Sequence, residues 1–329
     1  MGMLIDGEWC ADADRYMRDG AFEREPSKLP DPAPSEIAQR LCGNGRFILV
    51  AALSCPWSHR TTLVRALKNL RGIPVITACG PRTEGYALEK NNLGLSARHV
   101  HDLYSETDPA YSGRATVPLV WDLQSRTILS NSSATIARAF DVLADRWQLA
   151  PTPQAEHIET INARIYDGLT NAVYRAGFAT AQHAYESAVA DVFETLDWLE
   201  KRLRNQRCLF GNQITEADLF LFASLVRFDA VYAPLFRCTR RRLTDYAAIW
   251  AYARDVYSWP RISETIDFRA NLTGYFQNDT DNNPHGIVPE LPDVNWREPH
   301  GRDGFGALSV WQDGALVGLE NIAEFRHAH

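Results

Sequence analysis

One cysteine in the sequence has the neighbours of a reactive thiol. Cys55 begins the run CPWSHR, which ends at Arg60 and lies between an apolar segment, 47–53, and a segment with leucine and alanine at helical spacing, 57–71. Proline is favoured at the first position of a helix, so we expect Cys55 to be the N-cap, beside backbone N–H groups without helical partners. The helix dipole and the cationic side chains that follow favour the thiolate form. The pattern predicts a nucleophilic cysteine.

Packing is the alternative interpretation of Cys55, because a free cysteine is more often a small buried apolar residue. A strand followed by Cys-Pro and a helix favours the reactive interpretation. Position 58 is Ser, so the motif has no second thiol and cannot complete a dithiol cycle by itself. A lone thiolate is suited to exchange through a mixed disulfide, and we expect the second thiol to come from elsewhere.

The composition is that of an ordinary globular protein with room for two domains. Its 329 residues are 45% hydrophobic and 23% charged, and the net charge is −7. An acidic balance argues against nucleic acid or an anionic membrane as a partner. No apolar run approaches the length of a membrane span, and the N-terminus has no signal-peptide pattern. We expect a cytoplasmic protein that binds neither nucleic acid nor membrane.

The six cysteines, at positions 10, 42, 55, 79, 208 and 238, have neither disulfide-framework nor zinc spacing, which fits a reducing compartment. We expect the five cysteines other than Cys55 to be inert. Two His-x-His pairs, His99/His101 and His327/His329, have no third or fourth ligand evident beside them. The sequence therefore predicts no metal.

Before the linker at Pro151–Pro153, the pattern is that of an α/β domain. Residues 1–42 read as an irregular extension, with a Pro-rich stretch at 28–35 that excludes a helix or a central strand. The domain itself spans 43–150. Its expected elements are a strand at 47–53, a helix at 57–71, a strand at 74–79, a polar loop to about residue 100, strands at 117–122 and 126–129, and a last helix through Leu143. A βαβ unit followed by a hairpin and a helix is the thioredoxin-like order.

Pro118 stands at the start of an otherwise good strand, where a proline needs a reason. In thioredoxin-like folds the reason is a cis peptide bond facing the reactive cysteine, which turns the backbone of the preceding residue toward a ligand. The sequence alone does not decide between cis and trans.

After the linker, residues 151–276 read as an all-helical bundle. Apolar stripes run from Ile158 to Leu169 and from Val189 to Leu203. The run Thr215–Asp218 (TEAD) has the form of a helix cap with an acidic residue at the third helical position. The remaining residues, 277–329, form a polar tail with a hairpin expected at 308–317.

These motifs resemble the Xi class of the glutathione transferases, the glutathionyl-hydroquinone reductases. The resemblance rests on CPWSHR together with YSGRATVPLVWD (111–122), VYRAGFA (173–179), LVRFD (225–229) and GIVP (286–289). It covers most of residues 20–290 and implies a thioredoxin-like domain followed by an all-α domain. It also implies a homodimer.

The resemblance implies a reduction in which Cys55 takes the glutathionyl group from a glutathionyl-hydroquinone as a mixed disulfide. A second glutathione, the cosubstrate, then releases oxidised glutathione. Implied catalytic residues are Cys55, Tyr174 and Tyr275, and the hydroquinone would be bound by Tyr174, Tyr232 and Tyr275 through phenol hydrogen bonds. The implied thiol-binding residues are Trp57, Tyr86, Arg114, Val117, Pro118, Ser132 and Ser133.

Two positions depart from the family pattern. Ser132 stands where the family has the Glu that holds the γ-glutamyl ammonium, and Tyr86 stands where it has a Trp. Loss of a charge-assisted hydrogen bond costs about 1.5–3 kcal/mol, so a different low-molecular-weight thiol such as mycothiol is an alternative. A further alternative is a non-catalytic interaction module, against which the intact CPWSHR run argues.

Overall fold

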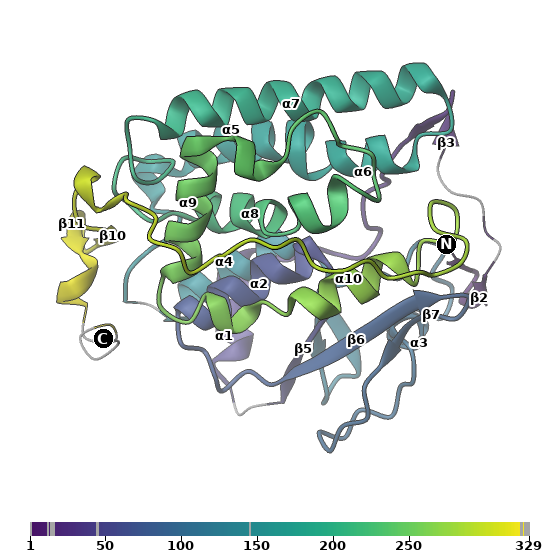
Figure 1. Cartoon of the computed structure of the whole chain (residues 1–329). Coiled ribbons are helices and arrows are strands. Elements are labelled where there is room, and N and C mark those ends of the chain that lie inside the picture. The colour runs from purple at the N-terminus through teal and green to yellow at the C-terminus, as the bar shows by residue number, and fades with distance from the viewer. Residues whose placement is uncertain are drawn as a thin grey trace. The chain divides into compact units, whose positions relative to one another are not determined.

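The computed structural model describes residues 2–11, 13, 17–43, 46–144, 146–322 and 325. The chain divides into two compact units (Figure 1). The first contains Met1–Met17, Glu23–Leu143 and Asp267–Pro289, and the second contains Arg18–Phe22, Ala144–Ile266 and Glu290–His329.

The first unit is built on a mixed sheet with the strand order β7-β6-β5-β8-β9 among the described residues. Figure 1 labels three of these strands, β5, β6 and β7. β5 (Phe47–Ala51) lies at its centre because all of its side chains are apolar and buried. It runs parallel to β6 (Val75–Arg82) and antiparallel to β8 (Leu119–Asp122). β7 (Gly85–Leu88) and β9 (Thr127–Ser130) form the two edges. This topology confirms the predicted thioredoxin-like α/β fold.

Four helices of the first unit accompany this sheet: α2 (Pro56–Leu67), α3 (Val100–Thr107), α4 (Ser133–Ala144) and α10 (Phe268–Phe276). α2 was predicted to continue to residue 71. It ends earlier because the chain reverses at Asn69, which has a positive φ of 53°. The prediction of a polar loop up to about residue 100 is wrong in part. β7 lies within this range, and α3 begins at its end. Neither has the apolar periodicity that would reveal it in sequence.

The segment before residue 43 is more regular than the sequence predicts. β1 (Met3–Ile5) and β2 (Glu8–Cys10) form a hairpin around Asp6-Gly7, both with positive φ. Two short strands follow, β3 (Met17–Arg18) and β4 (Ala21–Phe22). The Pro-rich stretch was expected to exclude a helix, yet α1 (Pro34–Leu41) begins inside it. Its proline occupies the first helical position, where the missing N–H costs nothing.

The second unit is helical, as predicted. Its α-helices are α5 (Ala155–Ile165), α6 (Ala172–Phe178), α7 (Gln182–Leu203), α8 (Glu216–Leu225) and α9 (Ala247–Ser258). Two π-helical turns span Tyr166–Thr170 and Phe228–Tyr232, and short 3₁₀ turns span Thr152–Gln154, Leu243–Asp245, Ser263–Thr265, Asp303–Phe305 and Leu319–Asn321.

α8 occupies the centre of this bundle, since every one of its residues is buried. Its predicted cap is confirmed: Thr215 and Asp218 form a capping box. The Asp218 carboxylate also accepts hydrogen bonds from the Leu209 N–H (2.8 Å) and the Tyr252 hydroxyl (3.0 Å). Burial raises the pKa of this carboxyl, and the hydrogen bonds act in the opposite direction.

The C-terminal segment of the second unit contains the expected hairpin, β10 (Ser309–Gln312) paired with β11 (Ala315–Gly318). Asp313 and Gly314 both have positive φ, as a two-residue hairpin turn requires. Among the described residues, no helix has the length and apolar character needed to cross a membrane.

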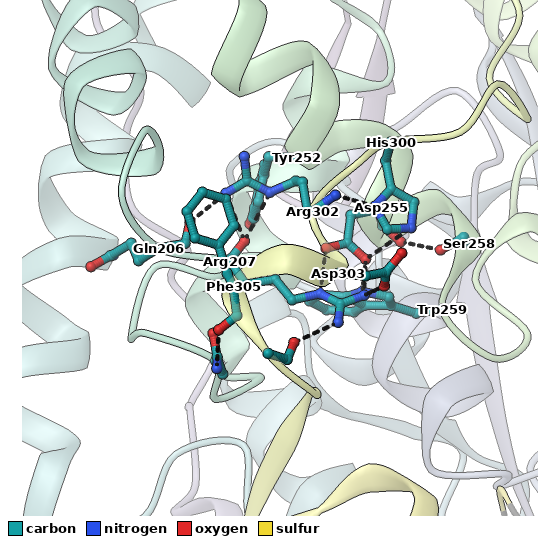
Figure 2. A network of polar contacts seen from close by, with 12 residues as sticks. Gln206, Arg207, Tyr252, Asp255, Ser258, Trp259, His300, Arg302, Asp303 and Phe305 are labelled. Carbon is teal, nitrogen blue, oxygen red and sulfur yellow. Dashed lines mark hydrogen bonds and ion pairs between the residues drawn. The ribbon is translucent and has the colours of Figure 1, made fainter.

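A buried polar network lies just before this hairpin (Figure 2). The guanidinium of Arg207 donates two hydrogen bonds to Asp255, at 2.8 and 3.0 Å, and Asp255 also accepts from the Trp259 indole N–H (3.2 Å). Arg302, which is buried, donates to main-chain carbonyl oxygens at the end of α7 and beyond, including that of Leu203 (2.9 Å). Cationic donors at the carbonyl end of a helix stabilise it.

Candidate active site around Cys55

Cys55 is the N-cap of α2, as predicted. Its sulfur accepts a hydrogen bond from the Ser58 N–H, with 3.5 Å between the nitrogen and Sγ. The turn before it is fixed by the Cys55 N–H, which donates to the Ala52 carbonyl (3.1 Å), and by the Ala52 N–H, which donates to the Ser58 hydroxyl (3.1 Å). The residue keeps 9% of its surface exposed. The helix start therefore presents a hydrogen-bond donor to the sulfur.

The peptide bond between Val117 and Pro118 is cis, which decides the alternative that the sequence left open. The Val117 carbonyl oxygen lies 3.6 Å from the sulfur of Cys55, close enough to accept a hydrogen bond when the residue is in its thiol form. The proline loop and the cysteine are therefore neighbours, and the main chain of residue 117 lies beside the sulfur.

Tyr86 lies close enough to Cys55, Arg114 and Arg24 for their charges to act on its phenol. The pKa of the Tyr86 phenol is raised, chiefly by burial and next by the negative charge of Cys55, while Arg114 and Arg24 act to lower it. A phenol with a raised pKa keeps its proton at neutral pH and can donate a hydrogen bond. The guanidinium of Arg24 lies 4.1 Å from the centre of the Trp57 ring, a cation–π contact. The charges of Arg24, Arg114 and Cys55 therefore all act on one phenol, that of Tyr86.

Arg24 is a candidate that the sequence reading missed. It lies in the segment before α1, and nothing in its local pattern indicates that it reaches Trp57. Among the predicted thiol-binding residues, Trp57 and Tyr86 pack on the buried apolar cluster that also contains Cys55 and Val117.

A second missed residue, Tyr104 of α3, links the proline loop to the start of α4. Its hydroxyl donates to the Thr116 carbonyl oxygen (2.9 Å) and accepts from the Asn131 amide (2.8 Å) and from the Thr116 N–H (3.2 Å). Burial raises the pKa of this phenol. One buried tyrosine therefore positions the residues before Val117 and before Ser132.

Ser132 and Ser133 lie at the N-terminus of α4. The Ser132 hydroxyl accepts from the Thr135 N–H (3.3 Å), and the Ser132 carbonyl accepts from the Ile136 N–H (2.9 Å). Helix N-termini bind carboxylates through exposed N–H groups and the dipole. This end of the helix suits the α-carboxylate of a γ-glutamyl group.

Tyr275 belongs to α10, which packs on the turn before Cys55 within the first unit. A Cβ added to Gly274 would lie 2.4 Å from the Cβ of Ser54, so the helix backbone touches the residue that precedes the cysteine. Just beyond the C-terminus of α10, the Asn278 amide donates to the Gly80 carbonyl of β6 (2.9 Å), which holds the same end of the helix at the sheet. The neighbour of Gly274, Tyr275, is half-buried.

Tyr174 and Tyr232 belong to the second unit, where they pack in one aromatic cluster. Their ring centres are 6.1 Å apart, and both rings contact Phe236, at 5.2 and 5.7 Å. Tyr174 keeps 8% of its surface exposed and Tyr232 none. Their assignment to hydroquinone binding stays a prediction.

The other cysteines have different surroundings. Burial raises the pKa of Cys238 to about 12, and burial together with the charges of Asp218 and Asp255 raises that of Cys208 well above its usual value. At Cys79, burial and Glu89 raise the pKa. A raised pKa favours the thiol form over the thiolate, so the inertness of these three cysteines stays a prediction.

Contrary to the expectation from the sequence, His99 and His101 have a third candidate ligand beside them. Asp102 brings a carboxylate to them, and one donor atom of each residue lies within 4.8 Å of the others. Asp102 is engaged in capping α3, since it accepts from the Arg98 and His99 N–H groups at 2.9 Å, and His101 stacks on Trp9. The pair His327/His329 lies outside the described residues.

Comparison with known proteins agrees with this geometry. Residues 182–255 match the family model "Glutathione S-transferase, C-terminal domain". The chain is 39% identical to glutathionyl-hydroquinone reductase YqjG of Escherichia coli K12, over 92% of this chain and 99% of that protein. It is 38% identical to glutathionyl-hydroquinone reductase PcpF of Sphingobium chlorophenolicum, over 89% and 96%.

Solved structures give the same result. The glutathione-bound structure of YqjG matches with a TM-score of 0.79 at 38% identity, covering 92% of this chain and 99% of that one. The Xi class transferase of Natrialba magadii matches with a TM-score of 0.80 at 34% identity, covering 92% and 97%. The chain belongs to the Xi class of the glutathione transferase superfamily, the glutathionyl-hydroquinone reductase family, and is an enzyme of that superfamily.

Proposed function

We propose that this enzyme reduces glutathionyl-hydroquinones with a thiol cosubstrate, through a mixed disulfide on Cys55. The observation that carries the proposal is the position of Cys55, which is the N-cap of α2 and lies beside the cis peptide bond before Pro118. A lone thiolate at a helix N-terminus is suited to attack on sulfur.

In the first step, the Cys55 thiolate attacks the sulfur of the glutathionyl-hydroquinone. The S–S bond to glutathione forms while the bond between sulfur and the ring carbon breaks, and that carbon keeps the electron pair and takes up a proton. In the second step, a glutathione thiolate attacks the mixed disulfide, oxidised glutathione leaves and the Cys55 thiolate returns. The hydroquinone gains two electrons and a proton in place of its thioether.

The residues of the first unit are assigned to the thiol. The main chain of Val117 would pair with the cysteinyl part of glutathione beside Pro118, and the N-terminus of α4 at Ser133 would bind its γ-glutamyl carboxylate. Tyr86, on which the charges of Cys55 and Arg114 act, would contact the rest of the glutathione peptide together with Arg114. Trp57 packs on the buried apolar cluster that contains Cys55.

Tyrosines are assigned to the hydroquinone. Tyr275 is carried by a helix that touches the turn before Cys55, so its phenol is the candidate to donate a hydrogen bond or the proton to the departing ring. Tyr174 and Tyr232 would hydrogen-bond the ring oxygens, an assignment that rests on family resemblance. Stabilising the developing oxyanion is a large term in catalysis of this kind.

Glutathione is the thiol that the glutathione-bound relatives favour. Mycothiol remains the second candidate because Ser132 replaces a carboxylate. Family membership also supports a homodimer in the cytoplasm, without a metal.

Mass spectrometry tests the proposal. The purified protein is incubated with a glutathionyl-hydroquinone and no free thiol, and the adduct is mapped by digestion. We expect one glutathione on Cys55 with release of free hydroquinone, and neither event in Cys55→Ala. Cys42→Ala is the matched control, since Cys42 is an exposed free cysteine. A protein that forms no adduct and releases no hydroquinone would be a non-catalytic module.

A further inference from the structure

A carboxylate from the N-terminal segment lies at the start of α4. Asp31, three residues before α1, accepts a hydrogen bond from the Ser130 hydroxyl at Oδ1 (2.8 Å) and one from the Thr135 hydroxyl at Oδ2 (2.8 Å). Ser130 ends β9 and Thr135 lies in the first turn of α4. Asp31 is therefore held against the turn that contains Ser132 and Ser133.

The same hydroxyl groups connect Asp31 to Ser132. The Thr135 hydroxyl lies 2.9 Å from the Ser132 hydroxyl, and the Ser132 N–H donates to the Ser130 hydroxyl at 3.1 Å. Asp31 thus stands one hydroxyl group away from the position where the family pattern has a glutamate and this chain has a serine.

Apolar packing of a neighbouring residue fixes the position of Asp31. Leu29, two residues before Asp31, is buried in the same apolar cluster as Cys55. The segment is fixed to the first unit by this packing, and Asp31 itself is exposed to solvent. A carboxylate offers about four acceptor sites, and the two hydroxyl groups occupy one on each oxygen. Acceptor sites therefore remain for a ligand.

We propose that Asp31 binds the ammonium group of the thiol's γ-glutamyl residue and is a specificity-determining residue for the proposed reaction. The inference rests on the proposed function, because it places the thiol at the N-terminus of α4. An ammonium and a carboxylate attract, and a charge-assisted hydrogen bond is about twice as strong as a neutral one. Asp31, which belongs to a segment distant in the sequence, supplies the negative charge that Ser132 lacks.

The consequence is a preference among thiols. Glutathione carries a free ammonium on its γ-glutamyl residue, whereas mycothiol, whose cysteine is N-acetylated, carries none. A carboxylate at this site favours glutathione over thiols without an ammonium group.

Calorimetric titration tests the proposal with two probes that differ in one group, glutathione and glutaryl-cysteinylglycine, which lacks only the amino group. Asp31→Asn keeps the size of the side chain and removes the charge. We expect Asp31→Asn to raise the dissociation constant for glutathione about tenfold and to leave that for glutaryl-cysteinylglycine unchanged. Glu36→Gln, which removes an exposed carboxylate from α1, is the matched control and should change neither dissociation constant.

A rescue variant separates recognition from folding. In Asp31→Asn combined with Ser132→Glu, we expect glutathione affinity to return while glutaryl-cysteinylglycine binds as before. Equal weakening of both probes, or no weakening of either, would overturn the role of Asp31. The titration measures binding without turnover. If the wild-type protein bound glutathione selectively but released no hydroquinone, the proposed function would be contradicted while the role of Asp31 in binding would stand.

Discussion

The six cysteines of this chain differ in the groups around their sulfur atoms, and these differences predict an order of reactivity. Cys55 has the Ser58 N–H at its sulfur, while Cys208 and Cys238 are buried with raised pKa values. At pH 7 we expect iodoacetamide to modify Cys55 faster than the exposed Cys42, because a helix N-terminus favours the thiolate. Cys208 and Cys238 should stay unmodified.

Peptide mass spectrometry over a time course measures these rates residue by residue. Preincubation with oxidised glutathione, which can form the mixed disulfide, should protect Cys55 and leave Cys42 unprotected. Modification of Cys55 no faster than that of Cys42 would contradict the assignment of an activated thiol.

Tyr104 offers a second prediction at the scale of one residue. Tyr104→Phe removes a hydroxyl that bonds the Thr116 main chain and the Asn131 amide. Each partner left unsatisfied in a buried site costs about 1–3 kcal/mol. We expect a loss of about 2 kcal/mol in the free energy of unfolding and a higher KM for the thiol, because the proline loop and the start of α4 lose their link.

Urea denaturation gives the stability, and a thiol titration of activity gives KM and kcat. Tyr257→Phe is the control, a partly buried tyrosine of α9 in the second unit. A stability loss with unchanged KM would mean that Tyr104 supports the fold without positioning the thiol site.

The features that a sequence predicts correctly here are those with a local cause. Cys55 was recognised as an N-cap because Pro56 and the helical spacing that follows are adjacent to it. Arg24, Asp31 and Tyr104 were missed because each reaches the site through the fold, from segments tens of residues away. Nothing in a single sequence indicates which arginine lies over Trp57 or which aspartate meets Thr135.

Among the helices and strands, α2 and β5 could be predicted from their local sequence, whereas α3 and β7 could not. The first two have strong apolar patterns and were predicted with errors only at their ends. α3 begins at a capping box of His99 and Asp102, which is an unusual pair, and β7 is a short, partly exposed edge strand. Their formation depends on packing against neighbours more than on their own sequence.

The contact between α10 and the turn before Cys55 predicts the effect of a small substitution. A Cβ at Gly274 would lie 2.4 Å from the Cβ and 2.5 Å from the Oγ of Ser54, and a contact this close forces the helix or the turn to move. We expect Gly274→Ala to reduce stability by about 1–3 kcal/mol. It should also reduce kcat, because Ser54 precedes the nucleophile and Tyr275 follows the glycine.

Gly72→Ala is the matched control, since no described atom lies within 4 Å of a Cβ built there. Thermal unfolding and steady-state kinetics measure both effects. If Gly274→Ala retained both stability and kcat, α10 would not be packed on the turn, and the assignment of Tyr275 would lose its geometric support.

On the scale of the whole molecule, the C-terminal residues serve the second unit, a role that the family motifs did not indicate. His300 lies beside Asp255 of α9, Asp303 pairs with Arg207, and Arg302 donates to the Leu203 carbonyl at the end of α7, so this segment joins the network around Asp255 (Figure 2). Asp255 is fully buried and Arg207 nearly so. Removing one member of a buried ion pair leaves the other charged and unpaired, which costs about 3–5 kcal/mol.

We therefore expect Asp255→Ala to lower the free energy of unfolding of the second unit by about 3–5 kcal/mol, and to expose residues 290–306 to proteolysis. Asp197→Ala is the matched control: its pair with Arg241 is of similar length, 3.1 Å, but both side chains are about half exposed, so its loss should cost about 0–1 kcal/mol. Urea unfolding and limited trypsin digestion, mapped by mass spectrometry, measure both outcomes. A similar small loss in the two variants would show that the network does not fasten the C-terminal segment, and that its anchoring comes from the hairpin and the apolar contacts of Val310 and Leu319 instead.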